Sequence, residues 1–344
     1  MFRALATIEA ITAIEAHPNA QMLEIAQVRG WRCVVRKADQ FKTGQHILYV
    51  EPDAHLDVAD ERFAFLAKGG MKTNAAGWKG HRLRTVKLRG VVSQGLVMPL
   101  CDFPELDQAV VEHRVDVTDL LPIRLWEPLI PFSSEAIGSF PIGVPKTDEQ
   151  RIQNCTKEEL AEALAWSHIE ITEKLDGTSV TAFVKEDGTV GVAGRNWELS
   201  PDSTASQVVV ASAAGRWLDE QEPGVFLQGE LIGPNIQGNP YKLTAPRWLL
   251  FTTGLLSEGY PCRMDPAVIL PDEALMSQMV PRITPGIITH DATVDELIGF
   301  ADGIRSMLNP DVLGEGVVIR GYDEAGVLRS SFKSISNAYL IKHG

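Results

Sequence analysis

The chain has 344 residues, of which 44% are hydrophobic and 22% are charged, and its formal net charge is −13. These proportions are typical of a soluble globular protein, and the length allows two domains with ordinary cores. No uncharged apolar run approaches the roughly 18 residues of a membrane-spanning helix, so an integral membrane protein is excluded.

The first residues and the cysteines predict a reducing, intracellular location. Glu9 and Glu15 soon interrupt the apolar start of the chain, so no signal peptide is expected. The cysteines are scattered and never form a CxxC pair, which predicts free thiols with neither a disulfide framework nor a zinc site. They are Cys33, Cys101, Cys155 and Cys262. We therefore expect a cytoplasmic protein.

The first 125 residues show short alternating or apolar runs that are separated by turn residues. Five or six short strands in about a hundred residues are typical of a small β-barrel such as an OB-fold. Residues 1–125 are therefore predicted to form an OB-fold domain. The expected strands are Ala4–Ile14, Leu23–Val28, Cys33–Arg36, His46–Val50, Arg82–Leu88 and Gly95–Leu100.

Positive charge is concentrated in this first part of the chain. Residues 1–125 hold 16 Lys and Arg against 15 Asp and Glu, whereas residues 126–344 hold 16 against 30. The segment from Lys68 to Arg89 contains seven basic residues and no acid, which predicts contact with the phosphates of a nucleic acid. The alternative is a solvated loop and edge strand. The basic residues are Lys68, Lys72, Lys79, Arg82, Arg84, Lys87 and Arg89.

Two tryptophans flank this basic segment. Trp31 and Trp78 could stack on bases, as the aromatic side chains of OB-folds do. For Trp31 a buried position in the barrel is the more common explanation. The segment from His17 to Ala20, together with Trp31, also looks somewhat like tRNA-binding OB modules.

A Pro- and Gly-rich stretch at residues 126–145 predicts a linker to a second domain at residues 146–344. Early in that domain Thr156 is expected to cap a helix that runs to Trp166, with Glu159 completing a capping box. Strand-like runs then alternate with helical segments to the C-terminus. The expected fold class is therefore α+β.

The sequence Lys174-Leu175-Asp176-Gly177 closes an apolar alternating run. A strand followed by a turn places the lysine at the edge of a sheet, where burial or a nearby metal ion can lower its pKa and make it a nucleophile. The common alternative is a strand-end lysine followed by an ordinary Asp-Gly turn. This motif is therefore weak by itself, and the segments that follow it decide its meaning.

Further segments follow Lys174 in a fixed order, and each places charged or aromatic residues at the end of, or within, a strand-like run. They are Gly194-Arg195-Asn196, the run from Phe226 to Gly233 that contains Glu230, Trp248-Leu249-Leu250-Phe251, Gly314-Glu315-Gly316 and Ser331-Phe332-Lys333-Ser334.

Taken together, these segments resemble the motifs of the covalent nucleotidyltransferase superfamily, which contains polynucleotide ligases and RNA capping enzymes. The resemblance covers residues 146 to the C-terminus. Thr178-Ser179 after the lysine motif and the segment Lys146–Gln153 before it look like nick-sealing RNA ligases. Only 11 residues follow Lys333, so a C-terminal OB domain is not expected. An OB domain placed first is similar to the RNA ligases that carry an N-terminal OB domain.

The resemblance implies a nucleotidyltransferase domain of ATP-grasp-like antiparallel sheets with helices. It implies that Lys174 attacks the α-phosphate of ATP and carries AMP. Asp176, Glu230 and Glu315 are expected to hold Mg²⁺ or Mn²⁺, directly or through water. Lys333 is expected to neutralise the α-phosphate. The same resemblance assigns nucleotide binding to Glu173 as well.

Three further residues have predicted roles. Arg151 is expected to bind the β- and γ-phosphates, Arg195 the ribose or the RNA end, and Phe251 the adenine. Each has a plain alternative, a surface arginine or a core aromatic. Many relatives carry a second lysine two residues after the equivalent of Lys333, and here that position is Ile335.

The predicted function is that of an ATP-dependent RNA ligase that joins a 3′-OH to a 5′-phosphate, at nicks in duplex RNA, as a monomer and with no membrane partner. Two alternatives stay open at this stage. One is an RNA capping guanylyltransferase, and the other is an RNA-binding protein with an inactive nucleotidyltransferase domain. Preference for GTP, or RNA binding without adenylation, would distinguish them.

Overall fold

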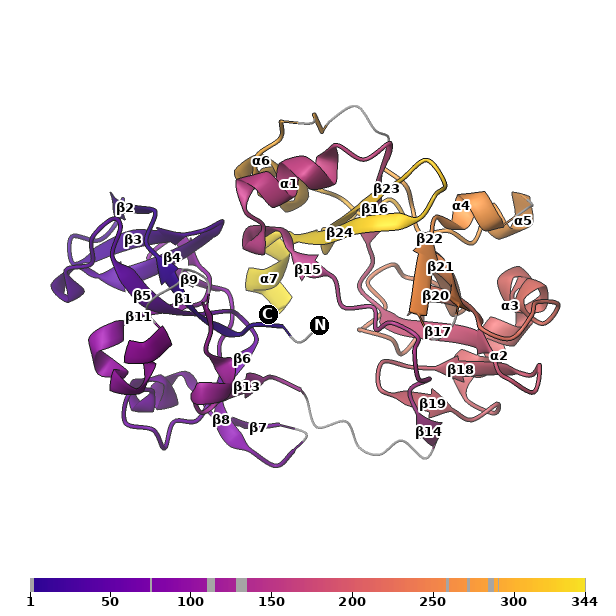
Figure 1. Cartoon of the computed structure of the whole chain (residues 1–344), viewed down its shortest axis with the longest axis horizontal. Coiled ribbons are helices and arrows are strands. Elements are labelled where there is room, and N and C mark those ends of the chain that lie inside the picture. Colours follow the sequence, from indigo (N-terminus) through magenta and orange to yellow (C-terminus); the bar gives the residue numbers. More distant parts are fainter. Residues whose placement is uncertain are drawn as a thin grey trace. The chain divides into compact units, whose positions relative to one another are not determined.

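The computed structural model describes residues 3–74, 76–109, 115–127, 135–257, 260–270, 273–283, 288–289 and 291–343. The chain divides into two compact units (Figure 1). The N-terminal unit comprises Met1–Pro131 with Leu340–Gly344, and the C-terminal unit comprises Phe132–Tyr339. Among the described residues, no helix is long and apolar enough to cross a membrane.

The N-terminal unit is built almost entirely from short strands. They form sheets with the strand orders β11-β5-β1-β12, β2-β3-β4 and β13-β6-β8-β7, and a separate pair β10-β9. The strands are β1 (Ala6–Ala10), β2 (Ala13–Ala16), β3 (Leu23–Val28), β4 (Trp31–Arg36), β5 (His46–Val50), β6 (Ala54–Leu56), β7 (Lys72–Thr73), β8 (Lys79–Arg82), β9 (Val86–Leu88), β10 (Val91–Ser93), β11 (Leu96–Pro99), β12 (Val115–Asp116) and β13 (Ile123–Leu125).

Strand β5 explains how one short sequence supports two apolar clusters. Successive side chains of a strand point to opposite faces. Ile47 and Tyr49 pack with the cluster that contains the fully buried Trp31, whereas Leu48 and Val50 pack into a second cluster. Trp31 is therefore a core residue, as its more common explanation predicted.

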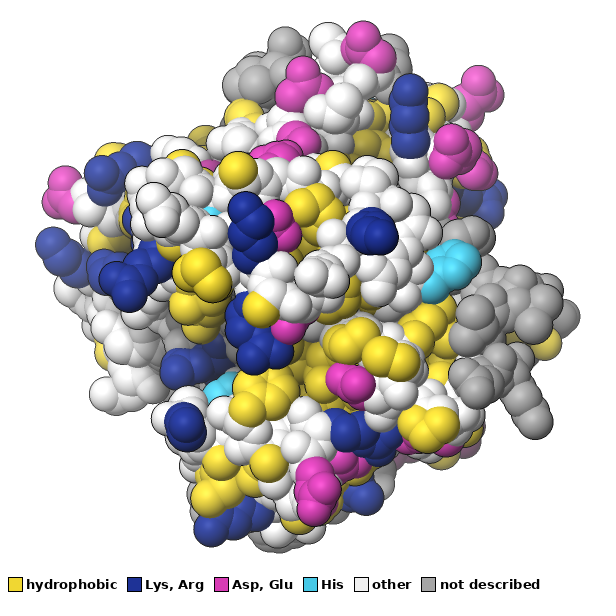
Figure 2. All heavy atoms as spheres, turned by 90° about the vertical axis from the view of Figure 1, so that its left-hand side faces the viewer, with side chains coloured by type: hydrophobic (Ala, Val, Ile, Leu, Met, Phe, Trp, Pro, Cys, Tyr) yellow, Lys and Arg dark blue, Asp and Glu magenta, His cyan; other side chains and the backbone are white. Residues whose placement is uncertain are grey.

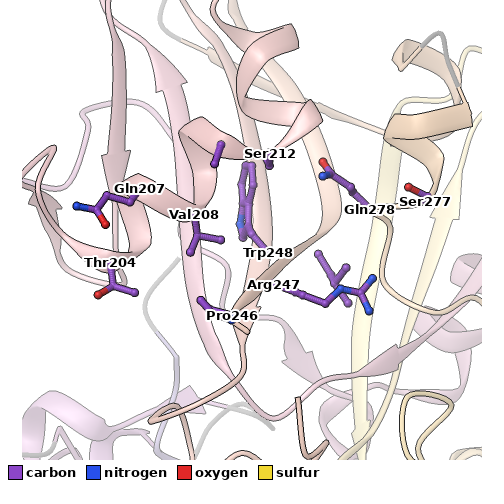
Figure 3. Close-up of a pocket in the computed structure, with 11 residues that line it drawn as sticks. Thr204, Gln207, Val208, Ser212, Pro246, Arg247, Trp248, Ser277 and Gln278 are labelled. Carbon is purple, nitrogen blue, oxygen red and sulfur yellow. The ribbon is translucent and has the colours of Figure 1, made fainter. Parts of the chain in front are cut away.

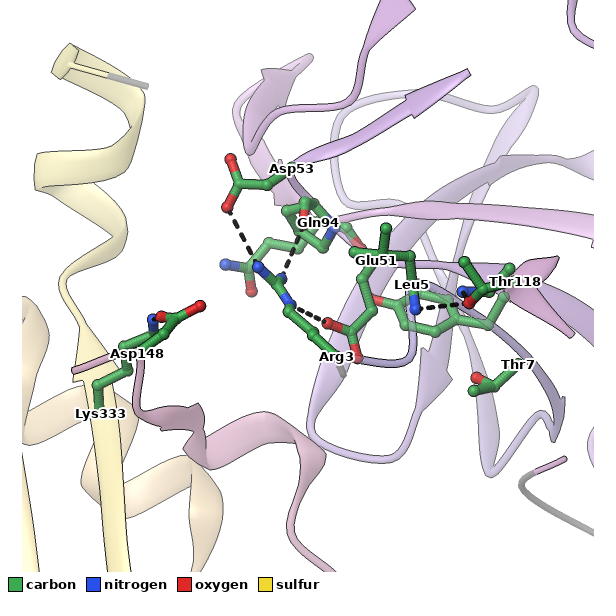
Figure 4. Close-up of polar contacts among 12 residues, drawn as sticks. Arg3, Leu5, Thr7, Glu51, Asp53, Gln94, Thr118, Asp148 and Lys333 are labelled. Atoms are coloured by element: carbon green, nitrogen blue, oxygen red, sulfur yellow. Dashed lines mark hydrogen bonds and ion pairs between the residues drawn. The ribbon is translucent and has the colours of Figure 1, made fainter. Parts of the chain in front are cut away.

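The beginning of the chain is fixed to this unit by polar contacts (Figure 4). Arg3 Nε donates to Glu51 Oε2 at 3.0 Å, and its Nη1 lies 3.6 Å from Asp53 Oδ2. The backbone N–H of Leu5 donates to Thr118 Oγ1 at 2.9 Å. These contacts join residues 48 to 113 positions apart and hold the first strand in its sheet.

The segment at residues 4–14, which the sequence predicts as one strand, is divided between two strands, β1 and β2. Strand β1 pairs with β5, whereas β2 pairs with β3 in another sheet. At the junction the N–H of Ile11 donates to Gln45 O and that of Thr12 donates to Gln27 O. The chain passes from one sheet to the next at this point, which local alternation of residues does not reveal. The expected strand at residues 82–88 is likewise divided between β8 and β9.

The C-terminal unit contains a sheet with the order β14-β19-β18-β17-β20-β21-β22 and another with the order β15-β24-β23-β16. Its strands are β14 (Ala136–Ser139), β15 (Gln150–Arg151), β16 (His168–Lys174), β17 (Thr178–Val184), β18 (Val190–Ala193), β19 (Trp197–Leu199), β20 (Val225–Ile232), β21 (Arg247–Ser257), β22 (Tyr260–Met264), β23 (Gly316–Tyr322) and β24 (Leu328–Ile335). Its helices are α1 (Lys157–Leu164), α2 (Thr204–Ala211), α3 (Ala213–Leu218), α4 (Pro266–Ile269), α5 (Glu273–Met276) and α6 (Val294–Asp302). Helix α7 (Asn337–His343) begins in this unit, and its residues from Leu340 onward are assigned to the N-terminal unit.

Helices cover one face of each of these sheets. Residues of α2 and α3 share an apolar cluster with β17, β18, β20 and β21, while residues of α1 and α6 share another with β16 and β23. The predicted cap of α1 is confirmed, because Thr156 Oγ1 accepts from the N–H of Glu159 and the Glu159 carboxylate accepts from the N–H of Thr156. The opposite face of the four-stranded sheet carries polar and charged residues.

The range predicted as a linker, residues 126–145, contains strand β14. This strand pairs with β19 at the edge of the seven-stranded sheet, and the register shifts between Ala136 and Gly138. Residues 128–134 of the predicted linker lie outside the described residues. The Pro-rich composition did not reveal that a segment without proline, residues 136–139, can add an edge strand.

Candidate active site

Cross-strand pairing places the predicted nucleophile beside the C-terminal lysine motif. In the four-stranded sheet, Lys174 lies opposite Gly316, which lies opposite Ile335. In a neighbouring row Val318 lies opposite Lys333. Because alternate residues of a strand share a face, Lys174, Lys333 and Ile335 all belong to one face of this sheet.

Two glycines at this site are required by close approach of the backbone. A Cβ atom on Gly316 would lie 2.1 Å from the carbonyl oxygen of Ser334, and one on Gly177 would lie 2.5 Å from that of Leu231. Any larger residue would push the strands apart at the point where Lys174 is held. The glycines of the two sequence motifs are thus explained by packing.

Carboxylates surround the amine of Lys174. Its Nζ lies 2.6 Å from Glu315 Oε1, and both side chains are largely buried, with exposures of 25% and 15%. Glu230 of β20 and Asp176 also act on the charge of this lysine. The structure therefore brings together the predicted nucleophile and all three predicted metal-binding acids.

These carboxylates reverse the effect that burial has on Lys174. Burial lowers the pKa of the amine, but Glu315, Glu230 and Asp176 together raise it above its ordinary value. In the ligand-free protein the lysine is therefore held as an ammonium ion. Desolvation alone does not produce the neutral amine that nucleophilic attack requires, so the negative charge around Lys174 has to be neutralised first.

The pKa of Glu230 is shifted by burial and by the same neighbouring charges. Burial raises the pKa of its carboxyl group to about 8, and the charges of Glu315 and Asp176 contribute to the rise while Lys174 opposes it. A carboxyl group in this state costs free energy when it ionises without a cation nearby. The cluster thus favours a cation that is shared by several carboxylates.

The metal-free protein should lose stability as the pH rises from 4.5 to about 8, the usual and the raised pKa of Glu230. In this range the folded state keeps a proton that the unfolded state has lost, so unfolding becomes easier as the pH rises. Glu230→Gln stays neutral and should show a smaller fall in melting temperature. Thermal melts in chelator across this range would test the prediction, and equal slopes for both proteins would contradict it.

Two tyrosines fix Asp176, and the sequence had given no signal for either. The N–H of Asp176 donates to the hydroxyl oxygen of Tyr241 at 2.6 Å, and the hydroxyl of Tyr339 donates to Asp176 Oδ2 at 2.5 Å. Tyr339 lies on α7, 163 residues away along the chain. Tyr241 and Tyr339 are therefore positioning residues for a predicted metal-binding acid.

A cationic group lies on the same face of the sheet. Arg151 pairs in register with Lys333, and both side chains are largely buried. Burial lowers the pKa of Lys333, its partner Asp148 opposes this, and the nearby charges of Arg151 and Lys174 lower it further. Lys333 Nζ lies 2.5 Å from Asp148 Oδ1 (Figure 4). Three cations gathered in this way are suited to a polyphosphate.

Hydrogen bonds attach the segment before Arg151 to the seven-stranded sheet. Gln228 Nε2 donates to the carbonyl oxygen of Pro145 at 2.7 Å, and the hydroxyls of Thr147 and Ser179 lie 2.6 Å apart. Both contacts join this segment to strands that border the lysine motif. The resemblance had singled out this segment without indicating how it is held.

The structure does not bring every predicted residue to the Lys174 face. Glu173 alternates with Lys174, and its Oε2 accepts from the N–H of Met307 at 2.9 Å, so its side chain belongs to the opposite, helix-covered face. Arg195 is exposed in the turn between β18 and β19, and no contact with the Lys174 cluster is seen among the described residues. Phe251 is only partly buried, and the guanidinium of Arg320 lies 5.4 Å from its ring centre.

Arg320 shares the face of Lys174, because both follow the same alternation along β16 and β23. Phe251 of the seven-stranded sheet therefore reaches across to the polar face of the four-stranded sheet. The predicted aromatic and the predicted nucleophile are thus found in the same interior between the sheets.

The described acidic side chains near Lys174 are not arranged to coordinate a metal ion directly. Among the described residues, no three His, Cys, Asp or Glu side chains are arranged to ligate one ion. Asp176 is engaged by Tyr339, and Glu315 by Lys174. The acids fit a hydrated cation, which meets carboxylates through its water molecules.

A separate cavity of about 540 Å³ lies between α2 and the start of β21 (Figure 3). None of the predicted site residues lines it. Its lining residues include Gln207, Arg247, Trp248 and Gln278. A hydrogen bond fixes the indole of Trp248, since its Nε1 donates to the carbonyl oxygen of Val180 at 3.2 Å. This cavity is not part of the Lys174 cluster.

Comparison with known families gives one match in each part of the chain. An OB-fold domain family matches residues 5–100, and the RNA ligase family matches residues 167–335. No curated protein matches the chain at a significant level.

Solved structures of an RNA ligase from Naegleria gruberi match nearly the whole chain. The complex with pyrophosphate is 35% identical, covers 99% of each chain and has a TM-score of 0.84. A glutamate-to-alanine variant with ATP and Mn is also 35% identical over 99% of each chain, with a TM-score of 0.82. A lysine-to-methionine variant with AMP and Mn is 35% identical over 99% of each chain, with a TM-score of 0.84.

The expected α+β fold, with an OB-fold domain before a ligase domain, is confirmed by these matches. Identity of 35% over nearly the full length of both chains is enough to establish the family. The chain belongs to the RNA ligase family.

Proposed function

We propose that this RNA ligase uses ATP and a divalent cation to join a 3′-OH to a 5′-phosphate at nicks in duplex RNA. The observation that carries the proposal is the position of Lys174 Nζ, 2.6 Å from Glu315, on a sheet face that also holds Lys333 and Arg151. An amine among acids, beside clustered cations, is suited to attack on a nucleoside triphosphate. Variants of the Naegleria gruberi RNA ligase have been solved with ATP and Mn and with AMP and Mn.

In the first step, Lys174 Nζ attacks the α-phosphorus of ATP. The ammonium ion first loses one proton to become the attacking amine. A P–N bond then forms, the bond from the α-phosphorus to the bridging oxygen breaks, pyrophosphate leaves and the nitrogen loses a second proton. Lys333 would neutralise charge that develops on the α-phosphate, while Arg151 would hold the β- and γ-phosphates. Phe251 would stack on the adenine.

Asp176, Glu230 and Glu315 would hold a hydrated Mg²⁺ or Mn²⁺ at this face. When bound, such a cation offsets the carboxylate charge that otherwise keeps Lys174 protonated. The tyrosines at Asp176 keep one of these acids in place before the nucleotide arrives.

In the second step, an oxygen of the RNA 5′-phosphate attacks the phosphorus of lysyl-AMP. The P–N bond breaks and RNA-adenylate forms, with the proton returned to the lysine. In the third step the oxygen of the 3′-OH attacks the 5′-phosphorus of RNA-adenylate, the P–O bond to AMP breaks, the hydroxyl proton is released to solvent and a phosphodiester results. Arg195 would contact the ribose or the RNA end. All of these groups come from one chain, so a monomer is sufficient.

A sealing assay tests the proposal directly. Wild-type protein, ATP and a divalent cation are incubated with a nicked RNA duplex that carries a labelled 5′-phosphate at the nick, and joined strands are measured on a denaturing gel. We expect a joined product that requires ATP and is not supported by GTP. Absence of the product with folded protein would contradict the proposal, and preference for GTP would favour capping.

Removal of residues 1–125 should weaken sealing by at least about tenfold and affect labelling of Lys174 with AMP much less, because phosphate contacts in the N-terminal unit contribute to RNA affinity. Six of the seven basic side chains between Lys68 and Arg89 are exposed. Equal loss of both steps would show that this unit only supports folding.

A further inference from the structure

The sheet β13-β6-β8-β7 of the N-terminal unit has two very different faces. One face carries Ala54, Leu56 and Ile123, which are buried in an apolar cluster of this unit. The alternate residues of the same strands must point the other way. Pairing determines which residues these are.

The opposite face carries a row of basic and imidazole side chains. His55 of β6 lies opposite Arg124 on one side and opposite Arg82 on the other. Lys72 of β7 lies opposite Gly80, two residues before Arg82 and so on the same face. Two tryptophans, Trp78 and Trp126, extend these rows.

The side chains on this face are packed against one another. The His55 ring lies between the tryptophans, with ring centres 5.3 Å from Trp78 and 5.0 Å from Trp126. The guanidinium of Arg124 lies 4.7 Å from the ring centre of Trp78, and Lys72 Nζ lies 5.8 Å from that of Trp126. The tryptophan positions are therefore set by fixed neighbours.

Gly80 gives His55 its place between the tryptophans. A Cβ atom on Gly80 would lie 3.1 Å from His55 Nε2 and 2.3 Å from the carbonyl oxygen of Leu56. His55 is fully buried, and its Nε2 lies 3.1 Å from the carbonyl oxygen of Lys72. The imidazole is thus fixed in edge contact with both indole rings.

The charges of this face are only partly neutralised. Arg82 Nη2 lies 2.9 Å from Asp53 Oδ1. Lys72 and Arg124 are exposed, and among the described residues no carboxylate lies within ion-pair distance of either. Trp78 and Trp126 are partly exposed, unlike the fully buried Trp31. In Figure 2, Lys and Arg side chains and hydrophobic side chains lie side by side on the visible face of the molecule.

We propose that this tryptophan face, formed by Lys72, Trp78, Arg124 and Trp126, binds unpaired nucleotides of an RNA strand that extends beyond the nicked duplex. The indole rings stack on bases, and Lys72 and Arg124 contact the flanking phosphates. A base in a duplex has its faces covered by its neighbours, so only an unpaired base can use a tryptophan in this way. The site deepens the proposed function, because it assumes that RNA is the substrate.

The test measures RNA binding by the full chain. Fluorescence anisotropy gives Kd for a fluorescein-labelled single-stranded 12-mer RNA and for a blunt RNA duplex, without ATP. Trp78→Ala combined with Arg124→Ala should raise Kd for the single strand by about tenfold or more and leave Kd for the duplex nearly unchanged. Lys72→Ala should reduce the salt dependence of single-strand binding by about 0.7 in the log–log slope.

Matched variants separate stacking from folding. Trp78→Phe keeps an aromatic ring and should restore most of the affinity, while Lys42→Ala, an exposed lysine outside this face, should bind as wild type does. Single-strand binding by Trp78→Ala/Arg124→Ala within twofold of wild type would overturn the proposal. Equal weakening for the blunt duplex would also overturn it, because the face would then bind paired backbone.

The outcome is independent of the sealing test. If wild type binds single strands through this face but joins no nick, the proposed function fails and the face stands. If wild type seals nicks while the double variant binds single strands as wild type does, the face fails and the proposed function stands.

Discussion

Replacement of Lys174 by alanine is expected to abolish covalent labelling of the protein with AMP. Lys174 is the amine that lies 2.6 Å from Glu315. Among the described residues no other lysine is paired with Asp176, Glu230 or Glu315, and Lys333 is paired with Asp148 instead. Incubation with α-labelled ATP and a divalent cation, followed by denaturing electrophoresis, measures the label. Sealing should disappear with it.

Two variants make this result specific. Lys174→Arg keeps a positive charge among the carboxylates, but a guanidinium stays protonated and cannot attack, so it should fold normally and remain unlabelled. Lys185→Ala removes a partly exposed lysine of the same unit that pairs with Glu198, and it should label as wild type does. A labelled Lys174→Ala protein would place the nucleophile elsewhere.

Replacement of Lys333 by alanine is expected to slow the labelling of Lys174 by about 10²–10³-fold, the usual effect of removing one group that stabilises transition-state charge. The effect should be large because the second lysine of many relatives is replaced here by Ile335. Ile335 is buried in the row of Lys174 and cannot supply charge. Single-turnover labelling with α-labelled ATP measures the rate.

Lys342→Ala is the matched control for this prediction, because Lys342 is exposed on α7 and has no partner in the Lys174 cluster among the described residues. Its labelling rate should equal that of wild type. A Lys333→Ala rate within about threefold of wild type would show that Arg151 is sufficient to hold the phosphates, and the role proposed for Lys333 would be wrong.

Local patterns in the sequence were sufficient for much of the fold. The alternation from His168 to Lys174 predicted the strand that ends in the proposed nucleophile, and the Thr156 capping box predicted the start of α1. These features depend on residues within a few positions of one another, so they are visible without tertiary structure. The division of residues 4–14 between two sheets was not visible, because it depends on partners such as Gln27 and Gln45.

The charge state of Lys174 shows a similar limit. The strand-end position correctly predicted a largely buried amine, and burial alone lowers its pKa. The net direction is upward, because Glu230 and Glu315, which are 56 and 141 residues away, contribute their charges. Only the folded chain determines which charges surround an amine.

The sequence by itself determined the order of the motifs, the two-part organisation and the residue types at the site, because each is written in a short run of neighbouring residues. Only the tertiary structure decided that Tyr339 holds Asp176, that Glu173 points away from Lys174, and that two tryptophans share a face with Arg124. Those contacts join distant residues through strand register and helix placement. A short window of sequence carries no information on either, since both are set by how the whole chain packs.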